Sequence, residues 1–315
     1  MINRAKTLPE FSIGKSGHEL FSGLKDLTIV TVPYERFSIF PKAVDALFKT
    51  VHIPFNLIIV ESSAPEQIRA ALERRRYRHL KNITIIYTQH IPPTYSAFNL
   101  AIPHLKTKYA FMMANDVKIQ KGSLESLMEH VRRHECDIVC PQNSVISREI
   151  IHMNNNHELN LNLSTLGLKT SFLISQKALK RVGKFDCAMN AFTGAIDTTL
   201  IFKEKKLDIC IDPNSFMHSY PDHFTPEIDS DLYVFQWSIE KNNRCLKRLE
   251  DKWNIRLPKD AHTVWFRDKS KSKNSYAFTL HLFAQLFGYV LKSVKALVNS
   301  LTRLSLSSSG QTIKR

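Results

Sequence analysis

Short runs of apolar, often β-branched residues recur along the chain and are separated by segments with helical spacing. The runs are Leu27–Val32, Asn56–Glu61, Ile83–Thr88, Tyr109–Ala114, Asp137–Cys140, Ser171–Ser175 and Asp208–Asp212. Several runs are continuously apolar, which is typical of strands buried on both faces. Between them, Phe40, Val44, Leu47 and Phe48 fall on one helical face, as do Leu124, Leu127, Met128 and Val131. This alternation predicts an α/β fold with a mostly parallel sheet flanked by helices.

In such a sheet, ligands bind beyond the carboxyl ends of the strands, so the residues that follow each strand are the first candidates for a site. Polar and acidic residues collect there. They include Pro33 and Tyr34 after the first run, Glu61 at the end of the second, and Asn115 and Asp116 after the fourth. The segment from Asp212 to His218 follows the last run.

The chain of 315 residues is long enough for one large domain with appendages. We expect an N-terminal extension over 1–25, a catalytic-type domain over 26–260 and a basic amphipathic helical tail over 261–315. The extension has no apolar stretch typical of a signal peptide. Within the domain, Asn143–Lys169 is polar and predicts a long loop, and Asp229–Trp253 predicts a single helix.

The net charge and the cysteine count limit the possible binding partners and the cellular compartment of the protein. The formal net charge is +15, which favours anionic partners such as nucleic acid, lipid or phosphorylated substrates. The basic residues are spread out and show no nucleic-acid-binding signature, so we expect no nucleic-acid partner. The 5 cysteines form no CxxC pair, and their odd, low count suits a reducing compartment rather than a disulfide framework. We therefore expect a cytoplasmic protein.

The tail carries an apolar stripe at helical spacing. The stripe consists of Phe283, Leu286, Phe287, Val290, Leu291, Val294, Leu297, Val298 and Leu301. Lys292, Lys295 and Arg303 lie off the stripe, which is typical of a helix lying on an anionic membrane surface. The alternative is a helix packed on the domain or on a partner. A membrane span ranks third, because Lys292 and Lys295 interrupt the apolar stretch.

The order and spacing of the strand-end motifs resemble family 2 glycosyltransferases of the GT-A fold, with a rhamnosyltransferase-like pattern. The motifs that carry the resemblance are Val32-Pro33-Tyr34, Ser96–Ala101, Ala114-Asn115-Asp116-Val117, Thr170–Asp186, Asp197-Thr198-Thr199-Leu200 and Asp212–His218. Each motif alone is weak, but their order on matching strands makes the set more specific. The resemblance covers about Asp26 to His218, with a weaker echo in Asn242–Trp253.

This resemblance implies inverting transfer of a hexosyl or deoxyhexosyl group from a nucleotide-diphosphate sugar to a hydroxyl of a saccharide or lipid-linked acceptor, as in polysaccharide biosynthesis. The implied nucleotide-sugar contacts are Pro33, Tyr34, Glu61, Asn99, Asn115 and Asp116. A divalent ion, Mn²⁺ or Mg²⁺, would be held by Asp116 and His218, and would stabilise the charge of the leaving diphosphate. Asp186 lies on the acceptor side, and Asp197 is the candidate general base.

Plainer interpretations stay open for each of these residues. Asp116 suits a turn, Asp197 suits the N-cap of a helix over Thr198–Lys206, and Asp186 suits a structural turn. His218 is one of 13 histidines, most of which need no special role, and Glu61 can simply end a strand.

The sequence also departs from the family pattern. Ala114, Ile196 and Thr199 stand where the family usually has acidic residues, so an inactive GT-A scaffold is the main alternative. A nucleotidyltransferase would want a Gly-rich loop near the first strand, and Pro33-Tyr34-Glu35-Arg36 has none.

Overall fold

A computed structural model of the chain describes residues 6–7, 26–34, 36–78, 83–142, 151–153, 159–161, 171–220 and 224–257. The chain divides into two compact units, 1–269 and 270–315, and every described residue belongs to the first. The tail predicted over 261–315 lies outside the described residues, so its membrane role stays a prediction. Among the helices in the described ranges, none is long and apolar enough to cross a bilayer.

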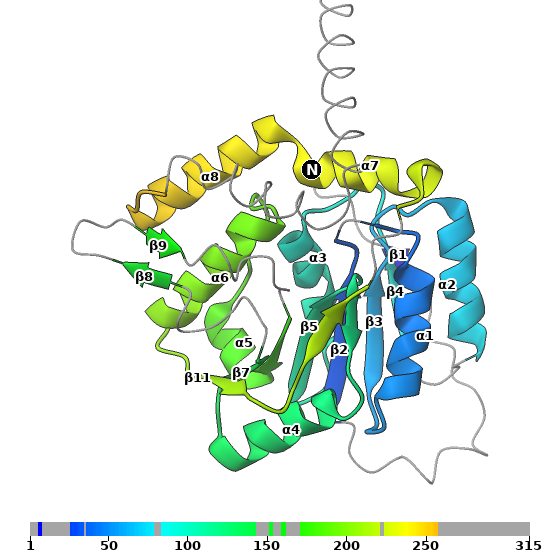
Figure 1. Ribbon diagram of the computed structural model, residues 1–315, viewed down its shortest axis with the longest axis horizontal. Coiled ribbons are helices and arrows are strands. Elements are labelled where there is room, and N and C mark those ends of the chain that lie inside the picture. The colour runs from blue at the N-terminus through cyan, green and yellow to red at the C-terminus, as the bar shows by residue number, and fades with distance from the viewer. Residues whose placement is uncertain are drawn as a thin grey trace, which may run out of the picture. The chain divides into compact units, whose positions relative to one another are not determined.

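An eight-stranded sheet forms the centre of the first unit, in the order β1-β4-β3-β2-β5-β10-β7-β11 (Figure 1). Its strands are β1 (Lys6–Thr7), β2 (Leu27–Val32), β3 (Asn56–Val60), β4 (Ile83–Tyr87), β5 (Tyr109–Ala114), β7 (Ile138–Pro141), β10 (Phe172–Ser175) and β11 (Ile209–Asp212). Strands β1 and β10 run antiparallel to their neighbours, and the other strands are parallel to one another. A small second sheet pairs β6 (Val117–Ile119) with β12 (Met217–Ser219).

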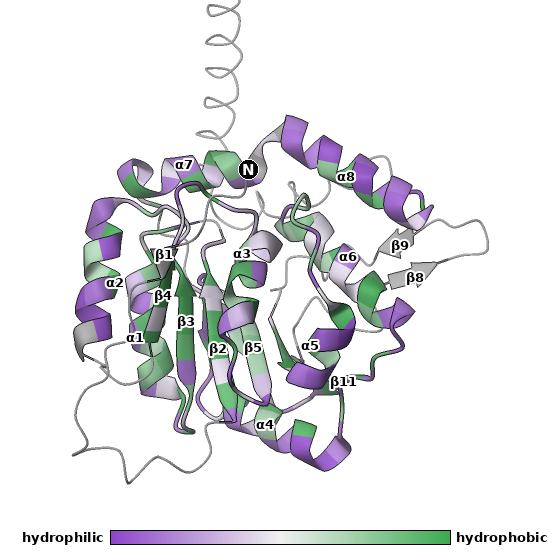
Figure 2. Cartoon of the chain, turned by 180° about the vertical axis from the view of Figure 1, so that it is seen from behind, coloured by the Kyte–Doolittle hydropathy of each residue, from purple (hydrophilic) through white to green (hydrophobic). Residues whose placement is uncertain are grey.

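Helices cover both faces of the central sheet. They are α1 (Phe40–Thr50), α2 (Glu66–Arg78), α3 (Thr94–Ala101), α4 (Ser123–His134), α5 (Gln176–Val182), α6 (Ala191–Glu204), α7 (Pro226–Trp237) and α8 (Ile239–Trp253), with a short 3-10 turn at Ile102–His104. Hydropathy follows this layering, because the strands are mainly apolar whereas the helices carry polar residues on their outer sides (Figure 2).

Successive residues of the strands point into two separate cores. On β2, Val30 and Val32 pack with side chains of α3, α5 and α6, whereas Leu27 and Ile29 pack with side chains of α1, α2 and α4. This alternation follows from the period of two in a strand, which needs apolar residues at every position when both faces are covered. The three-layer α/β architecture predicted from the continuous apolar runs is therefore confirmed.

All seven predicted strands are present, with bounds that differ from the predicted ones by at most one residue at either end. The first helical face, which includes Phe40 and Val44, belongs to α1, and the second, which includes Leu124 and Val131, belongs to α4. The predicted extension over 1–25 contributes β1, which pairs with β4 through Lys6 and Thr7. The boundaries predicted for the three parts of the chain remain predictions.

Three local predictions were wrong. The single helix predicted over Asp229–Trp253 is two helices, because Ser238 leaves helical geometry (φ −57°, ψ 117°) and its hydroxyl caps α8 by accepting from the backbone N–H of Lys241 at 3.4 Å. The loop predicted over Asn143–Lys169 contains two paired strands, β8 (Ile151–Met153) and β9 (Leu159–Leu161). Asp197 does not cap a helix, since α6 begins earlier and its N-cap is Asn190.

The cysteine prediction was also wrong. Cys136 and Cys210 form a disulfide, although they are 74 residues apart in the sequence. Cys136 follows α4 and Cys210 lies on β11, so their proximity depends on the fold and leaves no trace in sequence spacing.

Candidate donor and acceptor site

The ends of β2 and β5 are fastened together by the side chain of Asn115. Val32 and Ala114 are paired in the sheet, and Asn115 follows directly. Its carbonyl oxygen Oδ1 accepts from the backbone N–H of Tyr34 at 3.0 Å, and its Nδ2 donates to the carbonyl of Arg36 at 2.6 Å. Asn115 has no exposed surface, so its role here is to fix the turn after β2 rather than to face a ligand. Pro33 is buried in that turn and Tyr34 is half-buried.

Asp116 directly follows Asn115. The residue is 6% exposed, and its backbone carbonyl accepts from the N–H of Tyr220 at 3.0 Å. Within the part of the chain that the structure describes, no group donates to its side chain. A cation or a ligand that binds to such a carboxylate compensates its charge and its missing donors. Asp116 is therefore the best anchor for a positive ion or an N–H donor at this strand end.

His218 lies near Asp116 but is not directly opposite it. In the β6–β12 pair, His218 is opposite Lys118, while Tyr220 is bonded to Asp116. Asp116 and His218 are thus diagonal neighbours, a relation that places Cβ atoms about 7–8 Å apart or somewhat less. The His218 ring is exposed, and its Nε2 is 3.4 Å from Oε1 of Gln120.

These residues fit a divalent cation held by one protein carboxylate, with phosphate oxygens completing its shell. The fit rests on Asp116, a residue that is 6% exposed and whose carboxylate lacks a donor among the described residues. Mn²⁺ and Mg²⁺ accept oxygen ligands and need few protein groups when phosphates supply the others. His218 would need to leave Gln120 to serve as a second ligand.

Glu61 is fully engaged in the turns after β3 and β4. One oxygen accepts from the N–H of Ala64 at 2.7 Å, and the other from the N–H of Thr88 at 3.2 Å and from Arg69 at 3.3 Å. Burial raises the pKa of Glu61, and these hydrogen bonds with the Arg69 charge oppose the rise. Because Glu61 has no exposed surface, the predicted contact with the nucleotide base stays a prediction that would need this turn to open.

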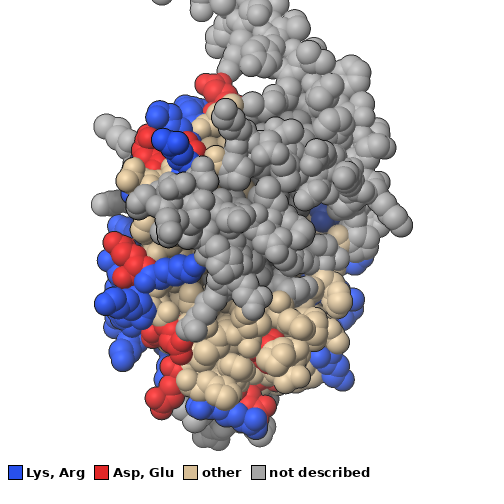
Figure 3. All heavy atoms as spheres, turned by 60° about the vertical axis from the view of Figure 1, so that its left-hand side comes forward, with Lys and Arg blue, Asp and Glu red and all other residues tan. Residues whose placement is uncertain are grey.

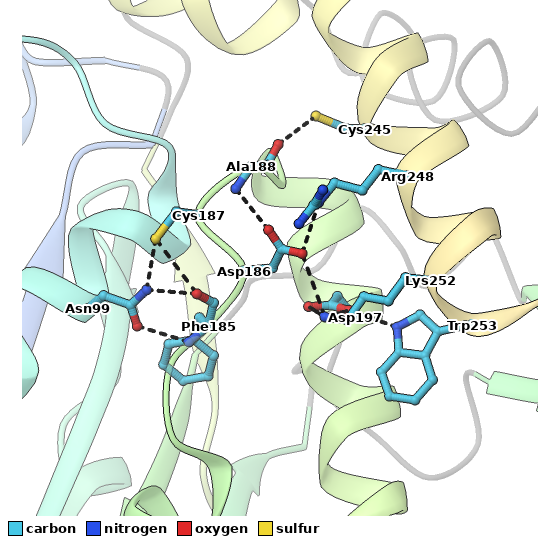
Figure 4. A network of polar contacts seen from close by, with 10 residues as sticks. All are labelled: Asn99, Phe185, Asp186, Cys187, Ala188, Asp197, Cys245, Arg248, Lys252 and Trp253. Carbon is cyan, nitrogen blue, oxygen red and sulfur yellow. Dashed lines mark hydrogen bonds and ion pairs between the residues drawn. The ribbon is translucent and has the colours of Figure 1, made fainter. Parts of the chain in front are cut away.

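Asn99 holds the turn between α5 and α6 rather than facing open space. Its Nδ2 donates to the carbonyl of Phe185 at 2.7 Å, and its Oδ1 accepts from the N–H of Phe185 at 2.9 Å (Figure 4). This reciprocal pair joins α3 to the turn between α5 and α6. Asn99 thus positions Asp186, the next residue along the chain. Its predicted contact with the nucleotide sugar remains untested.

Asp186 points from that turn toward α8. Its Oδ1 accepts from the N–H of Ala188 at 3.0 Å, and its Oδ2 accepts from Nε of Arg248 at 3.0 Å, with Nζ of Lys252 at 3.7 Å (Figure 4). Burial acts to raise the pKa of Asp186, but the hydrogen bonds and the two cations outweigh it and lower the pKa. Asp186 is consequently ionised and anchored.

Asp197 also points toward α8, from the second turn of α6. Its Oδ1 accepts from the indole N–H of Trp253 at 2.7 Å and lies 2.7 Å from Nζ of Lys252, and its Oδ2 accepts from the same Nζ at 2.9 Å. The side chain is only 2% exposed. In this geometry the carboxylate ties α6 to α8, so it can act as a base only if the contact with Lys252 and Trp253 opens.

The basic residues of α8 are functional candidates that the sequence analysis missed. A cavity of about 620 Å³ is lined by Asp186, Arg244, Lys247, Arg248, Asp251 and Lys252. The weak resemblance of Asn242–Trp253 to the family pattern was the sequence feature that could have indicated these residues, but it predicted no partner for any of their side chains. Figure 3 shows basic and acidic side chains lying beside one another on the face that it views, so the excess positive charge does not form a single-sign surface there.

The fold and the strand-end site define an α/β protein of the GT-A type. Residues 28–196 match the family described as glycosyl transferase family 2, and this match covers more than half of the 315 residues. The chain belongs to glycosyl transferase family 2. None of the curated protein sequences matches it.

Solved structures with a similar fold have little sequence identity to this chain. S. aureus TarS 1–349 in complex with UDP-GlcNAc has a TM-score of 0.52 and 14% identity, over 81% of this chain and 75% of that one. The mannosyltransferase PcManGT from Pyrobaculum calidifontis, in complex with GDP-Man and Mn²⁺, has a TM-score of 0.47 and 11% identity, over 85% and 87%. At such identity the first likeness supports the shared fold alone.

Proposed function

We propose that this chain transfers a hexosyl or deoxyhexosyl group from a nucleotide-diphosphate sugar to a hydroxyl of a saccharide or lipid-linked acceptor. The single observation that carries the proposal is Asp116 at the carboxyl end of β5, a residue that is 6% exposed and whose side chain has no donor among the described residues, in a chain of glycosyl transferase family 2. Ligands of parallel α/β sheets bind at this edge. The structure of TarS with UDP-GlcNAc is an example of a nucleotide sugar bound by a protein of similar fold.

A divalent cation, Mn²⁺ or Mg²⁺, is part of the proposal. When bound, the ion would neutralise charge on the leaving diphosphate. Asp116 would hold it, and His218 is the proposed second ligand. Asn115 and the buried Pro33 keep the neighbouring turn in place, so Tyr34 would border the donor without needing to move.

The acceptor is proposed to enter from the side of α8, and the transfer to invert the anomeric centre. Single displacement needs a base that removes the proton of the acceptor hydroxyl as it attacks. Asp197 is the predicted base, and the opening of its contacts with Lys252 and Trp253 is then a step of the reaction. Asp186 is the second candidate, because it lines the cavity beside α8.

A second candidate function is a GT-A scaffold that has lost catalysis. One specific observation favours it. Ile196 and Thr199, which replace acidic residues of the family pattern, are both buried, at 2% and 1% exposure, and Asp197 between them is held by two donors of α8. The two candidates differ in turnover and not in fold.

The remaining proposals concern place and partners. The apolar stripe of the tail supports binding to an anionic membrane surface, so we propose a peripheral location. The cytoplasmic part of the proposal rests on the odd, low cysteine count, although one disulfide is present.

A screen of nucleotide sugars with Mn²⁺, read by thermal denaturation, tests the donor proposal. A ligand at about 100 times its dissociation constant adds about 2.7 kcal/mol of stability, which corresponds to a rise of about 5–10 °C in Tm. Asp116→Ala should abolish the rise while keeping the melting of the free protein. Glu129→Ala, at an exposed residue of α4, is the matched control and should keep it. A screen in which no nucleotide sugar raises the Tm of the wild type would contradict the proposal.

A further inference from the structure

A histidine and two cysteines meet at a place that the glycosyltransferase proposal does not use. Ligand atoms of His130, Cys136 and Cys210 all lie within 4.8 Å of one another. His130 is on the last turns of α4, Cys136 is two residues beyond that helix, and Cys210 is the second residue of β11. The fold therefore brings together two segments that are 74 residues apart.

The two cysteines can exist as a disulfide or as a pair of thiols. Their Cα atoms are 6.2 Å apart, a separation compatible with the bond that the structure contains. In a reducing compartment such bonds are rare, and the same two sulfurs would be free thiols. Cys136 is 3% exposed and Cys210 is partly buried, so they would meet as neighbours within a protected pocket.

A second observation is the buried carboxylate beside the histidine. Asp212 is 1% exposed, and its Oδ1 lies 3.9 Å from Nδ1 of His130. Its Oδ2 is buried and has no hydrogen-bond partner among the described residues. A carboxylate that accepts a hydrogen bond from one ring nitrogen of a histidine orients the other nitrogen toward a metal. At 3.9 Å the two groups are not yet hydrogen-bonded, and a small rotation of His130 would bring Nδ1 within reach of Asp212.

We propose that, when the disulfide is reduced, His130, Cys136 and Cys210 bind a transition-metal ion of the Zn²⁺ class. Reduction by a thiol reductant breaks the S–S bond with two electrons and two protons and oxidises the reductant to its disulfide. Metal binding then releases both thiol protons to solvent and forms two metal–sulfur bonds and one metal–nitrogen bond. Two thiolates also neutralise the charge of a divalent ion.

The donor set selects the kind of metal. Thiolate and imidazole ligands suit Zn²⁺, whereas Mg²⁺ and Mn²⁺ prefer oxygen, so this site is chemically distinct from the one proposed at Asp116. Zinc–sulfur and zinc–nitrogen bonds of about 2.3 and 2.0 Å leave tetrahedral ligand atoms about 3.5–3.8 Å apart. To reach these separations, the two sulfurs must move apart after the disulfide is broken, and the histidine nitrogen, now within 4.8 Å of them, must approach. His134 is the candidate fourth ligand, because it is one turn after His130 and their ring centroids are 4.5 Å apart.

Metal content of the reduced full-length protein tests this inference. Protein reduced with dithiothreitol is incubated with ZnCl₂, freed of excess metal and reductant without exposure to oxygen, and assayed for bound zinc. We expect about one zinc per chain in the reduced wild type and none at this site in the oxidised wild type. Co²⁺ in place of Zn²⁺ should give thiolate-to-metal charge-transfer absorption.

Variants separate this site from adventitious binding. Cys210→Ser should abolish the bound zinc, and His130→Ala should weaken it at least about tenfold. Cys187→Ser, at an exposed free cysteine, and His52→Ala, at an exposed histidine, are the matched controls and should keep it. Reduced wild-type protein that binds no zinc, or zinc that survives His130→Ala and Cys210→Ser in folded variants, would overturn the inference. If Cys210→Ser does not fold, the comparison of reduced and oxidised wild type decides the question together with His130→Ala.

Discussion

Replacement of Asp197 by asparagine separates a structural role for this side chain from a catalytic one. The carboxylate is 2% exposed and accepts hydrogen bonds from the indole N–H of Trp253 and the ammonium group of Lys252. Asp197→Asn keeps the shape and removes the charge. It leaves Lys252 without its closest anion and weakens the bond to Trp253.

The expected loss of stability follows from these contacts. A hydrogen bond to a charged group contributes about 1.5–3 kcal/mol. The Lys252 side chain is 34% exposed, so water screens part of its share. We therefore expect Asp197→Asn to lower the free energy of unfolding by about 2 kcal/mol, which is a fall of about 4–8 °C in Tm. Asp251→Asn is the matched control, since it breaks an exposed i,i+4 pair with Lys247 and should cost less than about 0.5 kcal/mol.

Denaturant unfolding and turnover are measured on Asp197→Asn and on Asp45→Asn, which weakens the contact of Asp45 with Arg75 between α1 and α2. If Asp197 is also the base, Asp197→Asn loses at least about a hundredfold in turnover, while Asp45→Asn is destabilised and keeps its turnover within a few-fold. If the turnover of both variants falls only slightly and to the same degree, Asp197 has a structural role alone, and Asp186 becomes the candidate base. An Asp197→Asn variant that melts like the wild type would refute the structural reasoning.

Three further outcomes are expected. Gly194→Ala should lower the free energy of unfolding by about 1–2 kcal/mol, because a Cβ there would clash with Cδ2 of the buried Tyr95 ring. The cost of this overpacking exceeds the gain in helix propensity. An unchanged midpoint of denaturant unfolding would show that the ring can move freely. Arg248→Gln should reduce the loss of stability at acid pH, because the pKa of Asp186 is lowered below its ordinary value of 3.8 in the folded state. The stability that this carboxylate contributes is present above that ordinary value and is lost as the pH falls through the lower folded-state pKa; identical pH profiles of variant and wild type would contradict this. Removal of residues 266–315 should leave a cooperatively folding domain with weaker binding to anionic vesicles in a sedimentation assay, and a truncated chain that aggregates would show that the tail belongs to the core.

The sheet could be predicted from the sequence because burial on both faces leaves a local signature. Leu27–Val32 and Tyr109–Ala114 are continuously apolar, and each is a strand with the same bounds in the structure. The break at Ser238 was missed because one capping hydroxyl interrupts a helix without interrupting its apolar spacing.

The positions of Asn115 and Asp116 at a strand end could be predicted from the sequence, but the partners of the candidate side chains could not. Asn115 and Asp116 do follow β5, as their position in the sequence indicated. However, Asn115 bonds Tyr34, Asn99 bonds Phe185, and Asp197 bonds Trp253, all across more than 50 residues of chain. Side-chain pairing at such separations depends on how the layers pack, and one sequence holds no local record of it.

Release of nucleoside diphosphate from the donor that gives the largest thermal shift tests most directly whether this family 2 chain is an active glycosyltransferase. The assay compares wild type, Asp116→Ala and Glu129→Ala, with Mn²⁺ and with a chelator. The account predicts a metal-dependent release by wild type and Glu129→Ala, and a rate at least about a hundredfold lower for Asp116→Ala. A different result would contradict the account: the donor binds to the wild type, but the wild type releases nucleoside diphosphate no faster than Asp116→Ala does. That result would identify the chain as a non-catalytic scaffold.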